Sequence, residues 1–310
     1  MAKKKTSGVV WLRRLSQGVF LVIFLWLFYA LAYHPENATK GPTGMFFNLD
    51  PLIMLTVWLG GHAVATALLL SLITLAVTVV FGRWFCGWVC PFGTFNNMFS
   101  SLRSGKRKEK IKEASYTPMQ KTKYYIVTVV LVGSFFGANM AGWLDPFSFL
   151  YRSFAGAVFP AVNALFQGMF DWFYDVNPIG LKAVSEPVYR FMRGYFLTLG
   201  QPHYYWGMLF GVMFGGVLVL NLFKARFWCR YICPLGGLLG VVGKNPALQL
   251  KVDAEKCKSC MECVMECQGG AEPQSNESWR PAECVYCWNC RSVCPVKAIT
   301  FEFKVPEVRS

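Results

Sequence analysis

The sequence predicts a membrane protein that is all α-helical in the bilayer, with four transmembrane helices as two parallel repeats and a small α+β domain at its C-terminus. Of the 310 residues, 54% are hydrophobic and only 15% are charged, whereas soluble domains carry about 25% charged residues. A Cys-x-x-x-Cys-Pro motif occurs twice, each time after a long apolar run. Eight further cysteines lie close together near the C-terminus. These three observations lead to the fold class.

Four uncharged stretches are long enough to cross a bilayer as helices, which takes about 20 residues. They are residues 15–33, 63–82, 124–144 and 204–223. Basic residues precede the first stretch, fill the loop 103–123 and follow the fourth stretch, for example at Arg13 and Lys224. Because Lys and Arg next to a span stay in the cytoplasm, we expect four spans in contact with lipid and both termini inside. The apolar segment 153–170 contains Pro160, so we expect it to lie along the membrane surface.

The two Cys-x-x-x-Cys-Pro motifs are copies of one longer segment. Residues 81–93 and 224–236 share an arginine, two cysteines, a proline and a glycine at equal spacing. Upstream of each copy, an Asp-Pro pair begins at Asp50 and at Asp145, which is typical of a helix start. Two spans separate the copies, so the repeats are parallel and both cysteine pairs are expected on the cytoplasmic face. We expect a membrane domain at 1–245 and a C-terminal domain at 246–310.

The C-terminal cysteines are arranged in two equal runs. Their Cys-x-x-Cys-x-x-Cys-x-x-x-Cys spacing is that of the bacterial ferredoxins that hold two [4Fe–4S] clusters, in which the fourth cysteine of each run ligates the other cluster. The sequence therefore predicts one cluster on Cys257, Cys260, Cys263 and Cys294, and a second on Cys284, Cys287, Cys290 and Cys267. The residues Gln268-Gly269-Gly270 follow Cys267 in place of the usual proline, which predicts an altered local geometry with the cluster retained.

The four cysteines of the duplicated motif admit three interpretations. Cys86 and Cys90 lie four residues apart, as do Cys229 and Cys233, so both thiols of a pair share one helix face. Converging thiolates would suit a third [4Fe–4S] cluster. The alternatives are redox-active thiols or another metal such as Cu(I), and buried structural cysteines.

Few other residues carry recognisable chemistry. His62, His203, Asp50 and Asp145 are candidates for contact with a quinone or for proton transfer, although the histidines also suit an interface and the aspartates suit helix caps. No Cys-x-x-Cys-His motif is present, so covalent haem is not expected. The net charge of +14 gathers beside apolar runs, which indicates membrane anchoring rather than nucleic-acid binding. We identify no catalytic residue.

Taken together, the twinned motifs Cys86–Pro91 and Cys229–Pro234 and the eight C-terminal cysteines resemble the NapH/NosR-type membrane polyferredoxins. The resemblance covers nearly the whole chain and is best to the short NapH-like form. It implies an electron-transfer subunit of an oxidoreductase complex in the cytoplasmic membrane. Such a subunit takes electrons from quinol and passes them to a partner reductase.

Two other functions compatible with the sequence belong to different classes. The four motif cysteines would also suit a reductase or maturation factor for a copper centre. The chain would alternatively serve as a passive membrane anchor for a reductase, with the basic loop 103–123 as a docking surface. Copper in place of a third cluster would favour the first alternative, and quinol oxidation by the isolated chain would exclude the second.

Overall fold

The computed structural model describes residues 8–33, 44–62, 66–102, 105–176 and 206–303. The chain divides into two compact units, one of residues 1–148 with 217–310 and one of residues 149–216. The first unit contains every cysteine of the protein. Each unit is described by itself.

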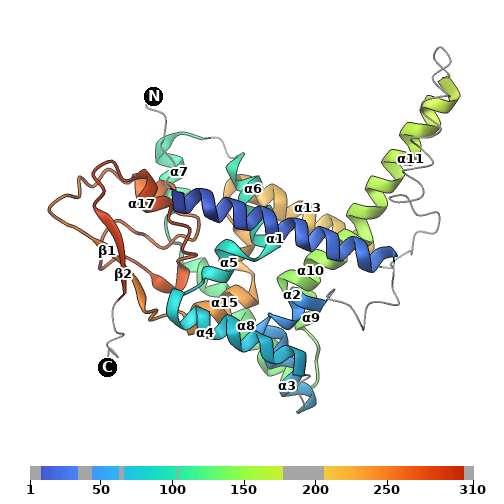
Figure 1. The fold of residues 1–310 in the computed structure, drawn as a ribbon, viewed down its shortest axis with the longest axis horizontal. Helices are drawn as coiled ribbons and strands as arrows, with labels where there is room; N and C mark the ends of the chain where they lie inside the picture. Colours follow the sequence, from blue (N-terminus) through green and yellow to red (C-terminus); the bar gives the residue numbers. More distant parts are fainter. Residues whose placement is uncertain (1–7, 34–43, 63–65, 103–104, 177–205, 304–310) are drawn as a thin grey trace. The chain divides into compact units, whose positions relative to one another are not determined.

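The first unit is built mainly from short helices (Figure 1). Its N-terminal part contains α1 (Gly8–Tyr33), α2 (Met45–Asn48), α3 (Pro51–Gly61), η3 (Thr66–Leu70), α4 (Ser71–Phe81), α5 (Trp84–Trp88), α6 (Pro91–Ser101), α7 (Arg107–Ala114), η4 (Pro118–Lys121), α8 (Thr122–Phe135), α9 (Ala141–Leu144) and the start of α10 (Pro146–Ser153). Its C-terminal part contains the end of α13 (Gly207–Phe223), α14 (Phe227–Tyr231), α15 (Pro234–Val242), β1 (Leu248–Val252), α16 (Glu262–Met265), η7 (Pro281–Glu283), α17 (Asn289–Val293) and β2 (Ile299–Phe303). The long helix α1 packs along α5 and α6 (Figure 1).

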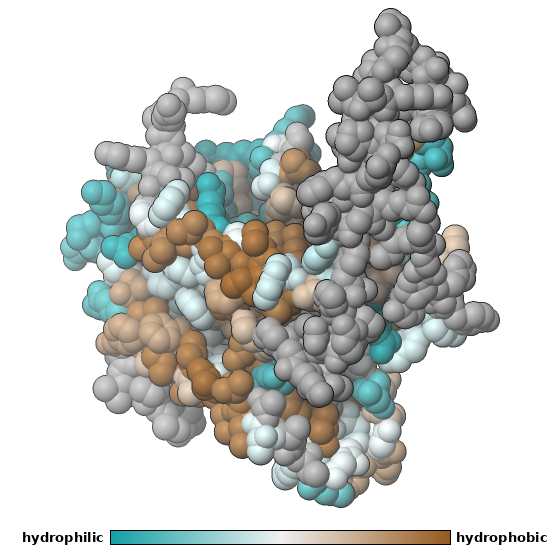
Figure 2. Space-filling view, turned by 45° about the vertical axis from the view of Figure 1, so that its right-hand side comes forward, coloured by the Kyte–Doolittle hydropathy of each residue, from teal (hydrophilic) through white to brown (hydrophobic). Residues whose placement is uncertain are grey.

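The helices of this unit expose large apolar side chains. Val22 on α1, Val129 on α8 and Val219 on α13 are each more than half exposed. Figure 2 shows hydrophobic side chains in continuous patches on one face of the molecule, with hydrophilic side chains towards its edge. Soluble monomers rarely expose apolar patches of such extent. The exposed faces therefore suit a lipid environment.

The apolar length is distributed differently from the sequence expectation. The stretches Gly8–Ala30 and Pro146–Trp172 are long and apolar enough to cross a membrane, whereas Pro51–Gly61, Leu68–Phe81 and Gly207–Phe223 are shorter. The second long stretch contains the segment 153–170 that we expected along the membrane surface. By length and composition, that segment is equally able to span.

The stretch 124–144 is not one continuous helix. Helix α8 ends at Phe135 and α9 begins at Ala141. Gly137 between them has a φ of +80°, a left-handed conformation that ends a helix and that glycine adopts without strain. Apolar composition alone did not reveal this break.

The second unit contains a helical stretch that accommodates an internal proline. Helix α10 runs through the π-helical turn η5 (Phe154–Val158) into α11 (Phe159–Val176). Pro160 has no N–H for the regular helical hydrogen bond, and the wider turn just before it changes the hydrogen-bond register. The helix therefore continues past the proline. Gly156 packs directly against Gly207 of α13, because a Cβ on either would be closer than 3.0 Å to the other's backbone.

The C-terminal part of the first unit has a ferredoxin-like strand–helix–helix–strand order. Strands β1 and β2 pair antiparallel, with Leu248 opposite Phe303 and Val252 opposite Ile299 (Figure 1). Inward residues of both strands pack with Cys290 in one small core. The two strands bring the beginning and the end of the C-terminal segment together, so that both cysteine runs lie in the loops between them.

Candidate metal centres

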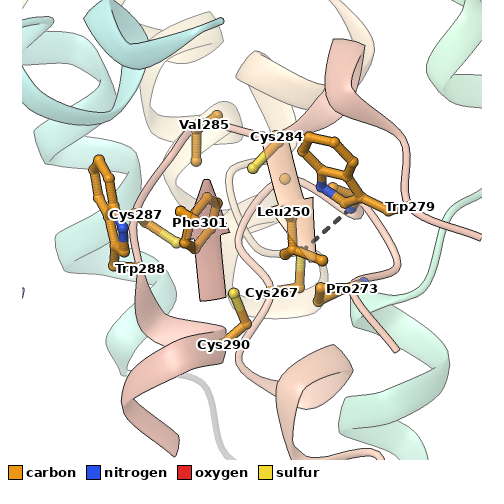
Figure 3. A pocket seen from close by; sticks show the side chains of 12 residues that line it. Leu250, Cys267, Pro273, Trp279, Cys284, Val285, Cys287, Trp288, Cys290 and Phe301 are labelled. Atoms are coloured by element: carbon orange, nitrogen blue, oxygen red, sulfur yellow. Dashed lines mark hydrogen bonds between the residues drawn. The ribbon is translucent and has the colours of Figure 1, made fainter. Parts of the chain in front are cut away.

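One cavity of the C-terminal part is lined by four cysteines from both runs. Cys267, Cys284, Cys287 and Cys290 surround it, and Figure 3 shows their sulfur atoms facing a common space. The space measures about 330 Å³, counted with the open solvent at its mouth. Trp279, Trp288 and Phe301 cover its sides (Figure 3). We call it the inner cavity.

A second cavity is lined by the other four cysteines of the two runs. Cys257, Cys260, Cys263 and Cys294 surround a space of about 380 Å³, again counted with open solvent. We call it the outer cavity. The eight cysteines thus line the two cavities in two sets of four, and the fourth cysteine of each run lies at the cavity of the other run.

The two cysteine runs have the same backbone conformation at equivalent positions. Ser259 and Met261 have positive φ in the first run, and Tyr286 and Trp288 have positive φ in the second. Left-handed conformations cost free energy for residues other than glycine, and such strain persists where the surrounding structure imposes it, often at functional sites. Its repetition at the same offsets indicates that both loops are shaped for the same kind of ligand.

The exits of the two runs are also equivalent. The amide of Ala271 donates to the Cys267 Sγ at 3.2 Å, and the amide of Ala298 donates to the Cys294 Sγ at 3.3 Å. Three residues after each of these cysteines, φ is positive, +71° at Gly270 and +51° at Lys297. The glycines after Cys267 thus follow the same path as the proline-containing exit after Cys294.

The residues around these cavities fit an iron–sulfur cluster. All eight sulfur donors are soft ligands of the kind that Fe–S clusters take. The Nε1 of Trp279 is buried beside the Cys284 thiol at the inner cavity. A thiolate at Cys284 would accept a hydrogen bond from it. Burial raises the pKa of the Cys263 thiol at the outer cavity to about 11, and bound iron would displace that proton.

The duplicated motif places four more cysteines together. Cys86 lies on α5 and Cys229 on α14, and Cys90 and Cys233 are the N-caps of α6 and α15. The Cys90 Sγ accepts a hydrogen bond from the amide of Gly93 at 3.5 Å, and the Cys233 Sγ accepts one from Gly236 at 3.3 Å. The proline after each N-cap occupies the first helical position, where its missing N–H costs nothing. Equal sequence thus produces equal local structure.

These four thiols are buried and close enough to affect one another's ionisation. Burial, followed by the neighbouring thiols of the set, raises the pKa of Cys90 and Cys233. Burial also raises the pKa of Cys229. We call the four residues the motif-cysteine site.

Two arginines cross between the repeats at this site. The Nη2 of Arg83 donates to the Cys229 carbonyl oxygen at 3.2 Å, and the Nη1 of Arg226 donates to the Cys86 carbonyl oxygen at 3.0 Å. Both side chains are at most 1% exposed. The Nε and Nη2 of Arg226 find no acceptor within the described residues. A buried cation is costly without a partner, so the site suits a negatively charged ligand.

Within the described ranges, no three His, Cys, Asp or Glu side chains lie as close together as one ion requires. A [4Fe–4S] cluster does not need three ligands around one ion, because each of its four irons takes one thiolate.

The motif-cysteine site packs against the loop that lines the inner cavity. The Nε1 of Trp88, between Cys86 and Cys90, donates to the Tyr286 carbonyl oxygen at 3.0 Å. Gly87 lies so close to the Val285 carbonyl oxygen that a Cβ there would approach it closer than 3.0 Å. Only glycine fits at this contact.

A buried ionic cluster holds the same interface. The Glu283 carboxylate, directly before Cys284, pairs with Lys123 and with Arg83, and accepts a hydrogen bond from the Tyr124 hydroxyl at 2.9 Å. Glu283 is 3% exposed and Lys123 is fully buried. Sequence reasoning missed both residues, because Lys123 reads as one more basic residue beside an apolar stretch. No signal in the sequence marks Glu283 as its partner.

The remaining candidate residues lie away from the cysteines or outside the described residues. The Asp50 Oδ1 accepts the amide of Leu52 at 2.7 Å and the Asp145 Oδ2 accepts that of Phe147 at 2.9 Å, so each aspartate caps a helix as its sequence predicts. The structure also brings these two buried carboxyl groups into contact with each other. His62 is exposed at the end of α3. His203 lies outside the described residues.

Two family models, each described as a 4Fe-4S binding domain, match the chain. One matches twice, at residues 63–110 and 206–252, and each match contains one Cys-x-x-x-Cys-Pro motif. The other matches residues 277–300. The double match agrees with the duplicated segment in the sequence, and it associates both motifs with iron–sulfur binding.

Several curated relatives match most of the chain. The ferredoxin-type protein NapH of Escherichia coli K12 is 25% identical over 81% of this chain and 73% of its own length. The putative electron transport protein YccM of the same organism is 23% identical over 79% of this chain and 57% of its own length. The regulatory protein NosR of Pseudomonas aeruginosa is 26% identical over 70% of this chain but only 24% of its own length. No solved structure gives a significant match.

Proposed function

Because the chain belongs to the NapH/NosR-type family of membrane polyferredoxins and is an iron–sulfur electron-transfer protein, we propose that it relays electrons between the quinone pool and a partner redox complex. The four-span topology, with two parallel repeats and both termini in the cytoplasm, is part of this proposal. The double match of one family model and the matching N-caps of α6 and α15 support the repeats. The proposed domains remain 1–245 and 246–310.

We propose three [4Fe–4S] clusters. Two are held by the cysteine sets of the inner and outer cavities, and the third by the motif-cysteine site. The observation that carries the third is the pair of buried guanidinium groups that cross between the repeats, with N–H groups of Arg226 left without an acceptor in the described part of the chain. A thiolate-ligated cluster is anionic and would offset their charge.

The chain's own residues set the conditions for electron transfer. A bound cluster supplies a one-electron redox group whose potential depends on charge, hydrogen bonds and solvent exposure. Arg83 and Arg226 place positive charge at the motif-cysteine site, and the amides of Gly93 and Gly236 donate to two of its sulfur atoms. Trp88, which is 7% exposed, helps to exclude water between this site and the inner cavity. Asp50, Asp145, His62 and His203 remain candidates for the quinone or proton site.

We expect about twelve irons and about twelve acid-labile sulfides per chain in the anaerobically purified protein. The double variant Cys86→Ser/Cys229→Ser should retain about eight irons, because the motif-cysteine site loses one ligand from each repeat. Chemical analysis with electron paramagnetic resonance (EPR) of the reduced protein measures this. The matched variant Cys267→Ser should change the signal of an inner-cavity cluster and leave that of the motif-cysteine site in place. About eight irons in the wild type would contradict a third cluster, and bound copper at that site would support the metal-maturation alternative.

The quinone part of the proposal has its own test. A water-soluble quinol, or the matching quinone acting on dithionite-reduced protein, should exchange electrons with the clusters in the isolated chain. Loss or return of visible iron–sulfur absorbance under anaerobic conditions measures the exchange. Dithionite reduction without exchange in either direction would contradict a quinone site. Electron exchange that occurs in the wild type but not in Cys86→Ser/Cys229→Ser would place the motif-cysteine site on the electron path between the quinone and the other clusters.

A further inference from the structure

The inner and the outer cavity differ in their contacts with the motif-cysteine site. We infer that the inner cavity, lined by Cys267 and the run Cys284–Cys290, is the first station after the motif-cysteine site, and that the outer cavity is the terminal station, where electrons are exchanged with the partner. The inference rests on the three-cluster proposal above and adds the order of the sites. Because electron tunnelling slows steeply with distance, contacts between the protein segments that hold the sites decide this order.

The run Cys284–Cys290, which lines the inner cavity and is called the inner run, is in direct contact with the first motif. Trp88 donates to the Tyr286 carbonyl oxygen, and its ring meets that of Trp288 edge to face, with 5.6 Å between the ring centroids. Val285 and Trp288 both line the inner cavity, and Gly87 is in contact with the Val285 carbonyl oxygen. Gly87 and Trp88 of the first motif thus contact the loop that holds the inner cysteines directly.

Helix α1 also contacts the segments that hold the inner cysteines. The Nη1 of Arg13, which is 1% exposed, donates to the Gln268 side chain at 3.1 Å, and its Nη2 donates to Asn289 at 3.3 Å. Gln268 follows Cys267, and Asn289 precedes Cys290. The same helix contacts the first motif, because Gln17 donates to the Gly87 carbonyl oxygen at 2.8 Å. A single helix therefore fixes the inner run and the first motif together.

The run Cys257–Cys263, which lines the outer cavity and is called the outer run, lies at the surface. Lys258 and Ser259, between Cys257 and Cys260, are exposed, whereas Tyr286 at the equivalent position of the inner run is fully buried. The outer run contacts helix α7, where Arg107 donates to the Cys260 carbonyl oxygen and pairs with Glu262 at 3.1 Å. Of the two cavities, the outer one is thus the more accessible to a partner protein.

The inner cavity also connects to the outer one. Cys290 of the inner set belongs to the small core cluster of the C-terminal part, and Cys257, Cys263 and Cys294 of the outer set pack against that cluster. The chain therefore provides a continuous series of sites, from the motif-cysteine site through the inner cavity to the outer cavity and the surface.

The order can be tested by the magnetic interaction between neighbouring clusters in the full-length reduced protein. A nearby paramagnetic centre speeds the spin relaxation of a cluster. We expect that Cys284→Ala, which removes an inner ligand, slows the relaxation of the motif-cysteine cluster several-fold, whereas Cys257→Ala, which removes an outer ligand, leaves it within measurement error. Iron analysis of each variant verifies that a single cluster is lost. Microwave power saturation of the EPR signal measures the relaxation.

Each possible result supports or contradicts the proposed order of the three sites. A change in Cys257→Ala and none in Cys284→Ala would reverse the order, and equal changes in both would contradict a series. Should a variant fail to fold, wild-type protein labelled by a paramagnetic ion in solution provides the second measurement. The ion should broaden the signal of the outer cluster more than that of the inner cluster, and the opposite result would overturn the inference. A wild-type count of about eight irons refutes the three-cluster proposal itself, whereas about twelve with the wrong relaxation pattern refutes only the order.

Discussion

Replacing Gly87 by alanine is expected to separate the C-terminal cysteine loops from the motif-cysteine site. The new Cβ would lie closer than 3.0 Å to the Val285 carbonyl oxygen, and the hydrogen bond from Trp88 to the Tyr286 carbonyl oxygen opposes separation of the two segments. Overpacking of this kind costs about 1–3 kcal/mol. That cost would raise the population of locally opened molecules by about 5- to 160-fold.

Limited proteolysis and EPR together measure the effect of Gly87→Ala. We expect faster cleavage in the connection between α15 and β1, and slower relaxation of the motif-cysteine cluster. Gly18→Ala on α1 is the matched control, because a Cβ at that position meets nothing within 4 Å. It should be neutral or slightly stabilising, as alanine favours a helix over glycine by up to about 1 kcal/mol. Equal behaviour of the two variants would contradict the tight contact at Val285.

Removing the Glu283 carboxylate is expected to destabilise the first unit strongly. Glu283→Ala would leave Lys123 and Arg83 buried without their acidic partner. Breaking a buried ion pair from one side costs about 3–5 kcal/mol, since the remaining charge stays desolvated. Thermal unfolding in detergent, followed by loss of iron–sulfur absorbance, measures the cost.

Two further variants separate charge from packing. Glu302→Gln breaks the exposed pair between Lys251 and Glu302, which are 3.3 Å apart, and surface pairs contribute only about 0–1 kcal/mol. Glu283→Gln also removes the carboxylate charge and should lower the stability of the first unit. The double variant Lys123→Met/Glu283→Gln should recover part of that stability, because the uncompensated ammonium group of Lys123 is removed. A cost for Glu283→Ala as small as that for Glu302→Gln would show that the buried cluster does not hold the interface.

The sequence was sufficient to predict those features that depend on residues close together in the chain. The cysteine spacing grouped Cys267 with the run that begins at Cys284, and the structure places these residues around one cavity. The pairs Asp50-Pro51 and Asp145-Pro146 predicted helix starts that the structure contains. The family resemblance, carried by the motifs, is confirmed by the relatives and the family models.

Helix boundaries were harder to predict, because apolar composition does not reveal where a helix ends. The break after Phe135 depends on Gly137, a single residue within an otherwise apolar stretch. The continuation of the helix past Pro160 depends on the π-helical turn before it. Each of these features is decided by backbone hydrogen bonds that hydropathy does not report.

The sequence by itself determined the two cysteine runs, the duplicated motif and the helix caps, because each of these depends on residues at most a few positions apart. Only the tertiary structure decided that Arg83 and Arg226 cross to the opposite repeat, that Glu283 pairs with Lys123, and that the inner run lies on Gly87 and Trp88. These contacts join residues that are 140 or more positions apart in the chain. Their formation follows from the packing of whole helices against the C-terminal loops, which no local pattern specifies.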